Sequence, residues 1–425
     1  MRKYFYNLIE KYLRLYVRPE DNLIFWSHPS DSLWDLFPNC VIWKDSIPKD
    51  ASTADYILIN GRLHFERDIQ AALEDLRAHC MQSTRLVITF YSVLWRPLLN
   101  LATLLKLRIK TPEQNWLSPE DIENLLLLAG YEIVKDDSKI LCPVYIPLLS
   151  EFLNRFIAPL PFFRRMTMLH ILIARPIFFP EVVSAKLSVS VIVPARNEAG
   201  NIENVVLRLP ALGPDDELIF VEGNSTDNTW EKIQEVQKRY GSTRHIVIAQ
   251  QDRKGKGDAV RKGFSLATKD ILMILDADLT VPPEDLSKFY NAIASGRGEF
   301  INGSRLVYPM EGQAMRFMNM VGNKFFALAF SFVLGQKLKD TLCGTKVISR
   351  NHYNKLAAHR KYFGEFDPFG DFDLIFGAAR LGLKIVEVPI GYRDRIYGST
   401  NISRWKHGLI LLRMLLFSAL RLRFI

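Results

Sequence analysis

The sequence predicts an α/β protein with two domains or more. Strand-like apolar runs alternate with amphipathic stretches through the second half of the 425 residues, which is the rhythm of a mostly parallel sheet covered by helices. Hydrophobic residues make up 48% of the chain, enough to bury a core in each domain. Pro176 and Pro180 interrupt the pattern between residues 175 and 186 and mark the boundary between the two halves.

Charge and cysteine usage narrow the function classes. The formal net charge is +9, and Lys and Arg are spread along the chain without a nucleic-acid-binding signature, so anionic phosphates or lipids are better partners than nucleic acid. Four cysteines lie far apart without metal-type spacing, which favours reduced thiols in a cytoplasmic protein. Charged residues follow Met1 too soon for a signal peptide.

The expected strands of the second half end in polar clusters. Ligands of parallel sheets bind at the carboxyl ends of the strands, so these clusters should share one site. The strands are expected at residues 189–193, 217–221, 245–249, 271–275 and 299–301. The clusters after the first and second strands contain Pro194, Asn197, Glu198, Glu222, Asn224, Ser225 and Asp227.

Asp276 and Asp278 follow the fourth strand with one alanine between them. Paired carboxylates give the hard oxygen ligands that Mg²⁺ or Mn²⁺ shares with phosphate oxygens and water. A solvated turn is the alternative for this pair taken alone. After the third strand, a loop with Lys256 and Asp258 combines glycines with basic side chains, a composition that suits phosphate binding and also plain surface turns.

Taken together, these motifs resemble family 2 glycosyltransferases of the GT-A fold, in the branch of dolichyl-phosphate mannose synthase and bacterial polyprenyl-phosphate glycosyltransferases. The resemblance covers roughly residues 187–415 and includes the segments 303–305, 340–346, 387–390 and 395–400. It implies metal-dependent, inverting transfer of a sugar from a nucleotide-sugar donor, with Mg²⁺ or Mn²⁺ as cofactor.

Roles follow from the resemblance position by position. It implies that Asp278 binds the metal and that Asp276 contacts the nucleotide, the sugar or the metal. It implies a nucleotide-sugar site made of Pro194, Asn197, Glu198, Glu222, Asn224, Lys256, Asp258 and Asp276. The usual Asp-Asp-Gly-Ser of the family is here Glu222 to Ser225, which leaves UDP against GDP open. Helix or turn capping is the preferred interpretation of Asp227.

Three arginines match positions that face phosphates in this branch. The resemblance implies that Arg305 and Arg316 look onto the acceptor phosphate, and that Arg395 lies on a loop that closes over the diphosphate. The planar guanidinium group suits such sites because it grips phosphate oxygens with two hydrogen bonds. An ordinary ion pair with Asp or Glu is the alternative fate of each arginine.

The acceptor decides which further residues the reaction needs. A polyprenyl phosphate is already anionic near neutral pH, so transfer to it is mainly a matter of positioning and charge neutralisation. Transfer to a hydroxyl of a glycan or a lipid-linked oligosaccharide needs a carboxylate base. Asp371 and Asp373 lie where that base usually falls in the family, and a helix N-terminal acid is the plainer interpretation of both.

Residues 20–150 carry a weaker resemblance to class I S-adenosylmethionine-dependent methyltransferases. The strand-like runs 56–59 and 86–89 and a helix start at residues 117–121 support it. Residues 25–31, where a cofactor loop should lie, contain no glycine. We therefore expect a degenerate domain that does not bind S-adenosylmethionine and that keeps a docking or regulatory role. An active fused methyltransferase is the alternative.

Two segments have the composition of helices that lie on a membrane. Residues 315–334 place apolar residues at helical spacing, and residues 409–425 combine Leu, Met and Phe with three arginines, Arg423 among them, and no acid. A core-facing helix is the alternative for each. The expected organisation is a methyltransferase-like domain at 1–178, the GT-A domain at 187–402 and a basic membrane-interface tail at 403–425.

From these patterns we expect a protein that binds peripherally to the cytoplasmic face of a membrane. A homo-oligomer is left open. The partners that we expect are a nucleotide sugar, a polyprenyl phosphate and the membrane surface. A non-catalytic membrane scaffold is the competing function from another class, and the metal- and phosphate-type residues argue against it.

Overall fold

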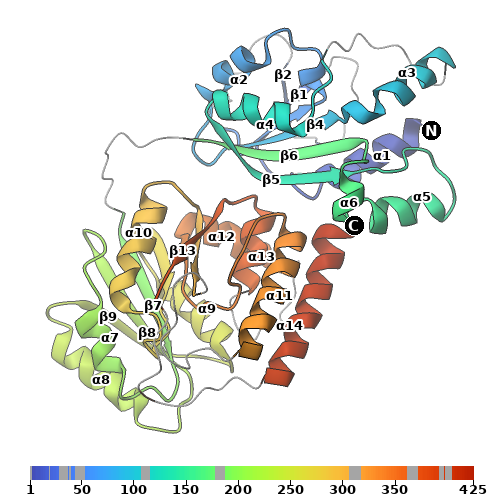
Figure 1. The fold of residues 1–425 in the computed structure, drawn as a ribbon. Helices are drawn as coiled ribbons and strands as arrows, with labels where there is room; N and C mark the ends of the chain where they lie inside the picture. Colours follow the sequence, from blue (N-terminus) through green and yellow to red (C-terminus); the bar gives the residue numbers. More distant parts are fainter. Residues whose placement is uncertain are drawn as a thin grey trace. The chain divides into compact units, whose positions relative to one another are not determined.

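The protein is described by a computed structural model. It describes residues 2–18, 20–27, 37, 40–43, 53–106, 115–177, 187–305, 317–360, 372–391, 397 and 404–425. The chain divides into two compact units, one made of Met1–Phe178 with Ala419–Ile425 and the other of Phe179–Ser418. Each unit is built on its own mostly parallel sheet (Figure 1), which confirms the α/β class.

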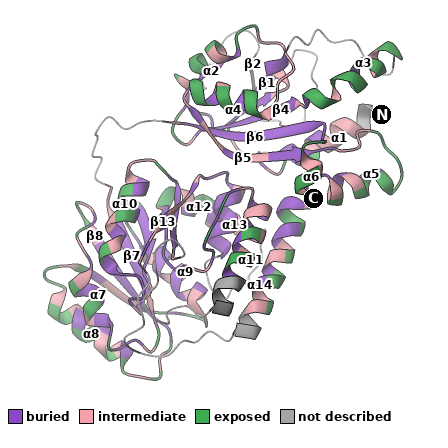
Figure 2. Ribbon diagram, viewed as in Figure 1, coloured by how far each residue is buried: buried purple, intermediate pink, exposed green. Residues whose placement is uncertain are grey.

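The first unit contains a six-stranded sheet in the order β2-β1-β3-β4-β6-β5. Strands β1 to β4 run parallel to one another, and β6 runs antiparallel to both β4 and β5. Figure 2 shows that most of β6 is buried, as expected of a strand that contains two Leu and two Ile residues and has both faces covered. The strands are β1 Leu23–Ser27, β2 Val41–Trp43, β3 Tyr56–Asn60, β4 Arg85–Tyr91, β5 Tyr131–Lys139 and β6 Leu169–Pro176.

Helices cover this sheet on both faces and leave one hydrophobic cluster on each. The helix start expected from the sequence at residues 117–121 is confirmed, because Ser118 and Asp121 form a capping box at the start of α4. The helices are α1 Arg2–Leu13, α2 Ile69–Arg77, α3 Arg96–Leu104, α4 Pro119–Leu128, α5 Leu149–Phe152 and α6 Pro161–Arg164.

The last residues of the chain belong to the first unit. Arg423 is 1% exposed, and its Nη1 lies 2.9 Å from Oδ1 of Asp137, which is equally buried. Tyr16 donates its hydroxyl to Asp137 over 2.5 Å, and Nζ of Lys139 lies 3.6 Å from the same carboxylate. The expectation that Arg423 faces lipid is therefore wrong, because a buried carboxylate takes up its charge.

The second unit contains a seven-stranded sheet in the order β13-β11-β12-β10-β7-β8-β9. Only β12 runs antiparallel to its neighbours within this described sheet. All five strands expected from the sequence are present, with small differences at their ends. The strands are β7 Val189–Ala195, β8 Asp216–Glu222, β9 His245–Gln250, β10 Ile271–Ile274, β11 Phe300–Ser304, β12 Lys346–Ser349 and β13 Ile385–Pro389.

The helices of this unit complete an α/β arrangement around a core of Val, Ile, Leu and Phe side chains. A Cβ atom on Gly263 would lie 2.4 Å from Ile192, so glycine allows α9 to pack closely on β7. The helices are α7 Ile202–Arg208, α8 Thr229–Tyr240, α9 Lys256–Leu266, α10 Leu286–Ala294, α11 Phe317–Leu334, α12 Arg350–Ala358, α13 Phe372–Arg380 and α14 Arg404–Ser418.

Helices α11 and α14 correspond to the two segments with membrane-like composition, and they pack against each other. Leu328 on α11 is 74% exposed, and Leu409 and Leu416 on α14 are 68% and 58% exposed. In the part of the chain that is described, no helix combines the length and hydrophobicity needed to cross a bilayer. The interfacial location of both helices stays a prediction.

Replacing Arg423 with alanine should destabilise the first unit by about 3 kcal/mol, because Asp137 loses a buried partner. The nearby, exposed Arg421 offers a matched control, and Arg421→Ala should change stability by less than about 1 kcal/mol. Urea unfolding, monitored by hydrogen exchange of the backbone amides in β5 and β6, measures the free energy of unfolding of each variant. Equal effects of the two substitutions would contradict the role given to Arg423.

Candidate nucleotide-sugar site

The strand-end clusters meet at one edge of the second sheet. Strands β10, β7 and β8 are parallel neighbours, and their register places Ala195 beside Glu222 at the carboxyl ends. Asp276 and Asp278 follow β10 at the same edge. This arrangement was predicted from the sequence, and it is the usual place for a ligand in such a sheet. Pro194, which pairs with Val221, is the last but one residue of β7.

Two asparagines shape the loops after β7 and β8. Asn197 and Asn224 both have a φ of 57°, a left-handed conformation that asparagine tolerates better than most residues. Asn197 accepts a hydrogen bond from the Thr226 backbone over 2.8 Å, and its own N–H donates to Ser225 over 3.0 Å. Because each loop bonds the other, both hold their shape at the sheet edge.

The acids in these loops are engaged with the protein. Glu198 accepts from the Asn201 side chain over 2.7 Å. Glu222, which is 2% exposed, accepts from the Ser225 backbone over 2.5 Å and from Gln250 over 3.2 Å. These contacts give both glutamates a part in holding the loops. Asp227 accepts from the backbone N–H of Thr229, the first residue of α8, so the turn-capping interpretation of Asp227 is confirmed.

Asp276 and Lys256 form the ion pair at the centre of the site. Nζ of Lys256 lies 2.6 Å from Oδ1 of Asp276, and both side chains are about a quarter exposed, at 28% and 26%. Burial tends to raise the pKa of Asp276, but Lys256, with help from Lys346 and Arg305, outweighs it and lowers that pKa. The carboxylate is therefore kept ionised at the edge of the sheet.

Gly344 lies against this ion pair. A Cβ atom at Gly344 would lie 2.0 Å from Oδ2 of Asp276 and 2.5 Å from Nζ of Lys256. Since real Cβ atoms do not approach other atoms so closely, only glycine fits here without moving one of the two charged groups. The sequence placed Gly344 in a motif of the resemblance without assigning it a role, and its contact with Asp276 needed the structure.

Asp278 is held in the turn that follows. Its Oδ1 accepts hydrogen bonds from the backbone N–H and the hydroxyl of Thr280, over 3.1 and 2.8 Å. Among the residues that the structure describes, no group of three or more His, Cys, Asp or Glu side chains could hold a metal by itself. The two partly exposed carboxylates fit a hard cation whose other ligands are phosphate oxygens and water.

The loop before α9 positions Lys256 at the first turn of the helix. Gly255 has a φ of 97°, and the carboxylate of Asp258 accepts from the Arg253 backbone over 2.7 Å. Asp258 thus stabilises the loop, while Lys256 presents its charge at the helix N-terminus, which is itself favourable for anions.

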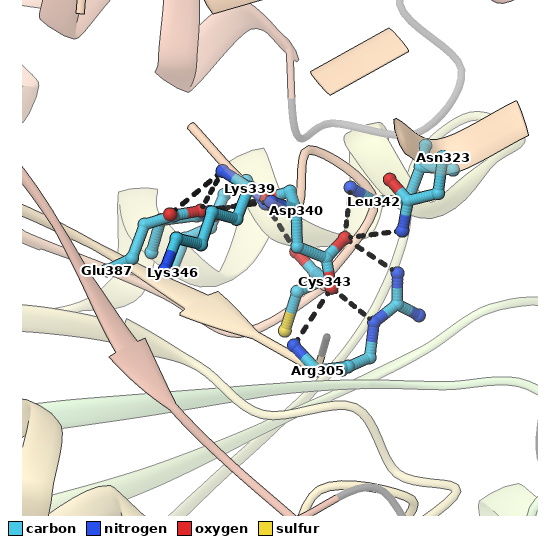
Figure 3. A network of polar contacts seen from close by, with 9 residues as sticks. Arg305, Asn323, Lys339, Asp340, Leu342, Cys343, Lys346 and Glu387 are labelled. Atoms are coloured by element: carbon cyan, nitrogen blue, oxygen red, sulfur yellow. Dashed lines mark hydrogen bonds and ion pairs between the residues drawn. The ribbon is translucent and has the colours of Figure 1, made fainter. Parts of the chain in front are cut away.

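Arg305 forms a two-pronged ion pair with Asp340 (Figure 3). Its Nε and Nη2 lie 2.7 and 2.9 Å from the two carboxylate oxygens. Asp340 is fully buried and also accepts from the Asn323 side chain and the Leu342 backbone, each over 3.0 Å. Burial would raise the pKa of Asp340, yet Arg305, together with the Asn323 side chain, holds it at about 2. The ion-pair alternative for Arg305 is therefore observed.

A second acid fixes the segment that runs from Asp340 to Gly344. Glu387 on β13 accepts from the backbone N–H groups of Lys339 and Asp340, over 2.8 and 3.0 Å, and Figure 3 shows it beside that segment. Burial raises the pKa of Glu387. Burial also raises the pKa of Cys343 to about 11, which keeps its thiol protonated.

The remaining candidates are an acid engaged with two arginines and three residues outside the described part of the chain. Asp373, at the start of α13, is 8% exposed, and its Oδ2 lies 3.7 Å from Nη1 of Arg261 and 3.6 Å from Nε of Arg360. Asp371, Arg316 and Arg395 fall outside the described residues. Tyr397 is described, and its ring covers Gly200 so closely that a Cβ there would lie 2.7 Å away.

Comparison with known proteins finds a family match that lies within the second unit. Residues 190–357 match the model of glycosyl transferase family 2. The chain is 30% identical over 222 residues to a dolichol-phosphate mannosyltransferase of Pyrococcus furiosus, across 51% of this chain and 59% of the relative, so it spans less than two thirds of that protein. It is 30% identical over 224 residues to glycosyltransferase AglJ of Haloferax volcanii, across 52% of this chain and 68% of the relative.

Among solved structures, glucosyl-3-phosphoglycerate synthase of Mycobacterium tuberculosis, in complex with Mn²⁺, UDP and glucosyl-3-phosphoglycerate, is similar with a TM-score of 0.41 and 21% identity. That match covers 56% of this chain and 80% of the other. The matching family model and the extent of the match to AglJ identify this chain as a member of glycosyltransferase family 2.

Proposed function

We propose that the protein transfers a sugar from a nucleotide-sugar donor to a polyprenyl phosphate, with inversion at the anomeric carbon and with Mg²⁺ or Mn²⁺. The observation that carries this proposal is the Asp276-Ala277-Asp278 motif beside Lys256 at the carboxyl edge of the sheet, among loops suited to a nucleotide. The name of the Pyrococcus relative, a dolichol-phosphate mannosyltransferase, supports the acceptor.

On the donor side, the chain supplies both signs of charge. Asp278 and Asp276 would hold the cation, which supplies positive charge to the leaving nucleotide diphosphate. Lys256 adds a second positive charge at the start of α9. Gly344 leaves room beside Asp276, where any side chain would intrude. The loops that carry Asn197 and Asn224 bond each other and so offer a preorganised surface to the nucleotide.

On the acceptor side, no strong base is required when a phosphate oxygen attacks. The bond from this oxygen to the anomeric carbon forms as the bond to the nucleotide diphosphate breaks, so the task is positioning. Asp373 supports this view, since two guanidinium groups already engage its carboxylate. We propose Arg305, Arg316 and Arg395 as phosphate contacts. Arg305 would make this contact while it stays paired with Asp340.

We propose peripheral binding at the cytoplasmic face of a membrane, supported by the exposed leucines of α11 and α14. For the first unit, we propose a docking or regulatory role without S-adenosylmethionine, supported by the glycine-free segment 25–31. Transfer to a glycan hydroxyl is the alternative reaction, and it would make Asp371 or Asp373 the base.

The test is transfer of labelled sugar from UDP-, GDP- and dTDP-sugars to a short polyprenyl phosphate, with Mg²⁺, Mn²⁺ or chelator. We expect a chelator-sensitive product that partitions into organic solvent. Donor binding by folded protein without such a product from any donor would contradict the lipid acceptor and favour the glycan alternative.

Asp278→Ala should reduce kcat/KM about 10³-fold, because the proposed cation site loses a ligand. The protein should keep its thermal midpoint, since the hydrogen bonds between Asp278 and Thr280 lie within one local turn at the sheet edge. Asp215→Ala is a matched control, because Asp215 is 63% exposed and directly precedes β8 at the opposite end of the strand. Near-normal transfer by Asp278→Ala would overturn the site assignment.

Gly344→Ala should reduce transfer at least about 10²-fold, because its Cβ displaces Asp276 or Lys256. In Gly322→Ala the added Cβ meets nothing within 4 Å, so this control should retain activity. Steady-state kinetics with a saturating donor, together with the thermal midpoint of each variant, separates a site effect from misfolding. Full activity of Gly344→Ala would show that the ion pair has no part in transfer.

A further inference from the structure

Exposed apolar side chains concentrate in two segments of the first unit, outside the candidate site. Residues 93–106 and 144–166 hold more than half of the large, exposed apolar side chains found in the described part of the chain. Soluble surfaces usually scatter such residues singly. Figure 2 shows the exposed character of α3, which lies in the first of these segments.

Both segments leave the same end of the first sheet. Residues 93–106 follow β4, and residues 144–166 connect β5 to β6. The register pairs Tyr91 with Leu169. The indole Nε1 of Trp95 donates to the carbonyl of Met166 over 2.8 Å, and the backbone N–H of Ser92 donates to Met168 over 2.9 Å. The two segments therefore form one continuous surface, which we call the apolar end.

The helix in this surface turns its leucines outward. Leu98 and Leu101 lie on α3 and are 54% and 51% exposed. Leu94, just before the helix, and Leu105, at its C-cap, extend the spacing to four, three and four residues and are 62% and 59% exposed. That spacing gathers them on one face of a helix. Only Leu99 on this helix is buried, at 9%. A helix that served the core would bury the leucine face instead.

The second segment projects its apolar side chains in the same way. Leu148 is 87% exposed, Phe162 76% and Tyr145 61%. Such exposure belongs to side chains that stand out from a surface, whereas a groove for a partner helix would recess its apolar lining. Protruding Leu, Phe and Tyr side chains match the contact that a protein makes with the interfacial region of a bilayer.

The charges of the apolar end have one dominant sign. Residues 93–106 contain Arg96 and Lys106 and no acid, and both side chains are exposed. In residues 144–166, Glu151 is the only acid beside three arginines, of which Arg165 is exposed. Basic side chains around an apolar surface complement the phosphates of anionic lipids.

We propose that the apolar end docks the first unit onto an anionic bilayer surface. This contact is additional to the one proposed for α11 and α14, and it gives the first unit a function of its own. It extends the proposed peripheral location and does not depend on sugar transfer, because vesicle binding is measured without donor or acceptor.

The test is co-sedimentation of the full chain with phosphatidylcholine vesicles, with and without phosphatidylglycerol. Leu101→Asp/Leu148→Asp should weaken partitioning into the anionic vesicles at least about tenfold, since two apolar contacts are replaced by charges of the wrong sign. Leu127→Asp/Leu128→Asp is the matched control, because these leucines of α4 are similarly exposed, at 62% and 57%. It should bind as the unaltered protein does.

Equal binding by both double variants would overturn the proposal. So would an unaltered protein that sediments as a dimer without vesicles and becomes monomeric in Leu101→Asp/Leu148→Asp, because a second copy would then cover the surface. The fluorescence of Trp95 gives a second, independent measurement. It uses the unaltered chain and does not require that the double variants fold. Vesicles of brominated lipid should quench the fluorescence of the unaltered chain more than that of Trp95→Phe, and equal quenching would contradict docking at this end.

Discussion

The buried carboxylate of Asp340 is the constraint on which the site depends. An ion with no exposure to water must be compensated within the protein, and Asp340 gathers its compensation from distant parts of the chain. Arg305 comes from the end of β11 and Asn323 from α11. The same segment then carries Gly344 onto Asp276. A single buried charge thus ties the side of the site proposed for the acceptor to the side proposed for the donor.

The polar groups of the site divide into those that build it and those that face a ligand. Glu222, Glu198 and Asp258 accept hydrogen bonds from residues three to five positions away in the chain, so their carboxylates stabilise the local loop structure. Asp276 and Lys256 differ, because they pair with each other while both remain about a quarter exposed. Two opposite charges held at a sheet edge match a ligand that brings a cation and an anionic diphosphate together. The loops contain several acids, but most of these carboxylates stabilise the loops, so few of them face the ligand.

Sequence patterns predicted the second sheet and the meeting of its clusters, because strand ends and loops are local features that a parallel sheet brings to one edge. The sequence left undecided whether Arg305 binds a phosphate or forms an ion pair, since an arginine beside a phosphate site and one beside a buried acid look alike in sequence. The role of Gly344 was out of reach, because it rests on a contact between residues 68 positions apart in the chain. The antiparallel β12 was also missed, since its apolar run consists of Val347 and Ile348 alone.

The burial of Arg423 bears on the organisation of the whole chain. The first unit is made of residues before 179 and after 418, so the second unit is inserted within it. Asp137 has Lys139 at 3.6 Å but meets its closest cationic partner only when residue 423 is in place. Because the buried counter-ion Arg423 follows the inserted unit in the chain, the first unit completes its packing only after the inserted unit has been synthesised. Truncation after residue 178 therefore leaves the first unit incomplete, because Asp137 loses its buried partner Arg423.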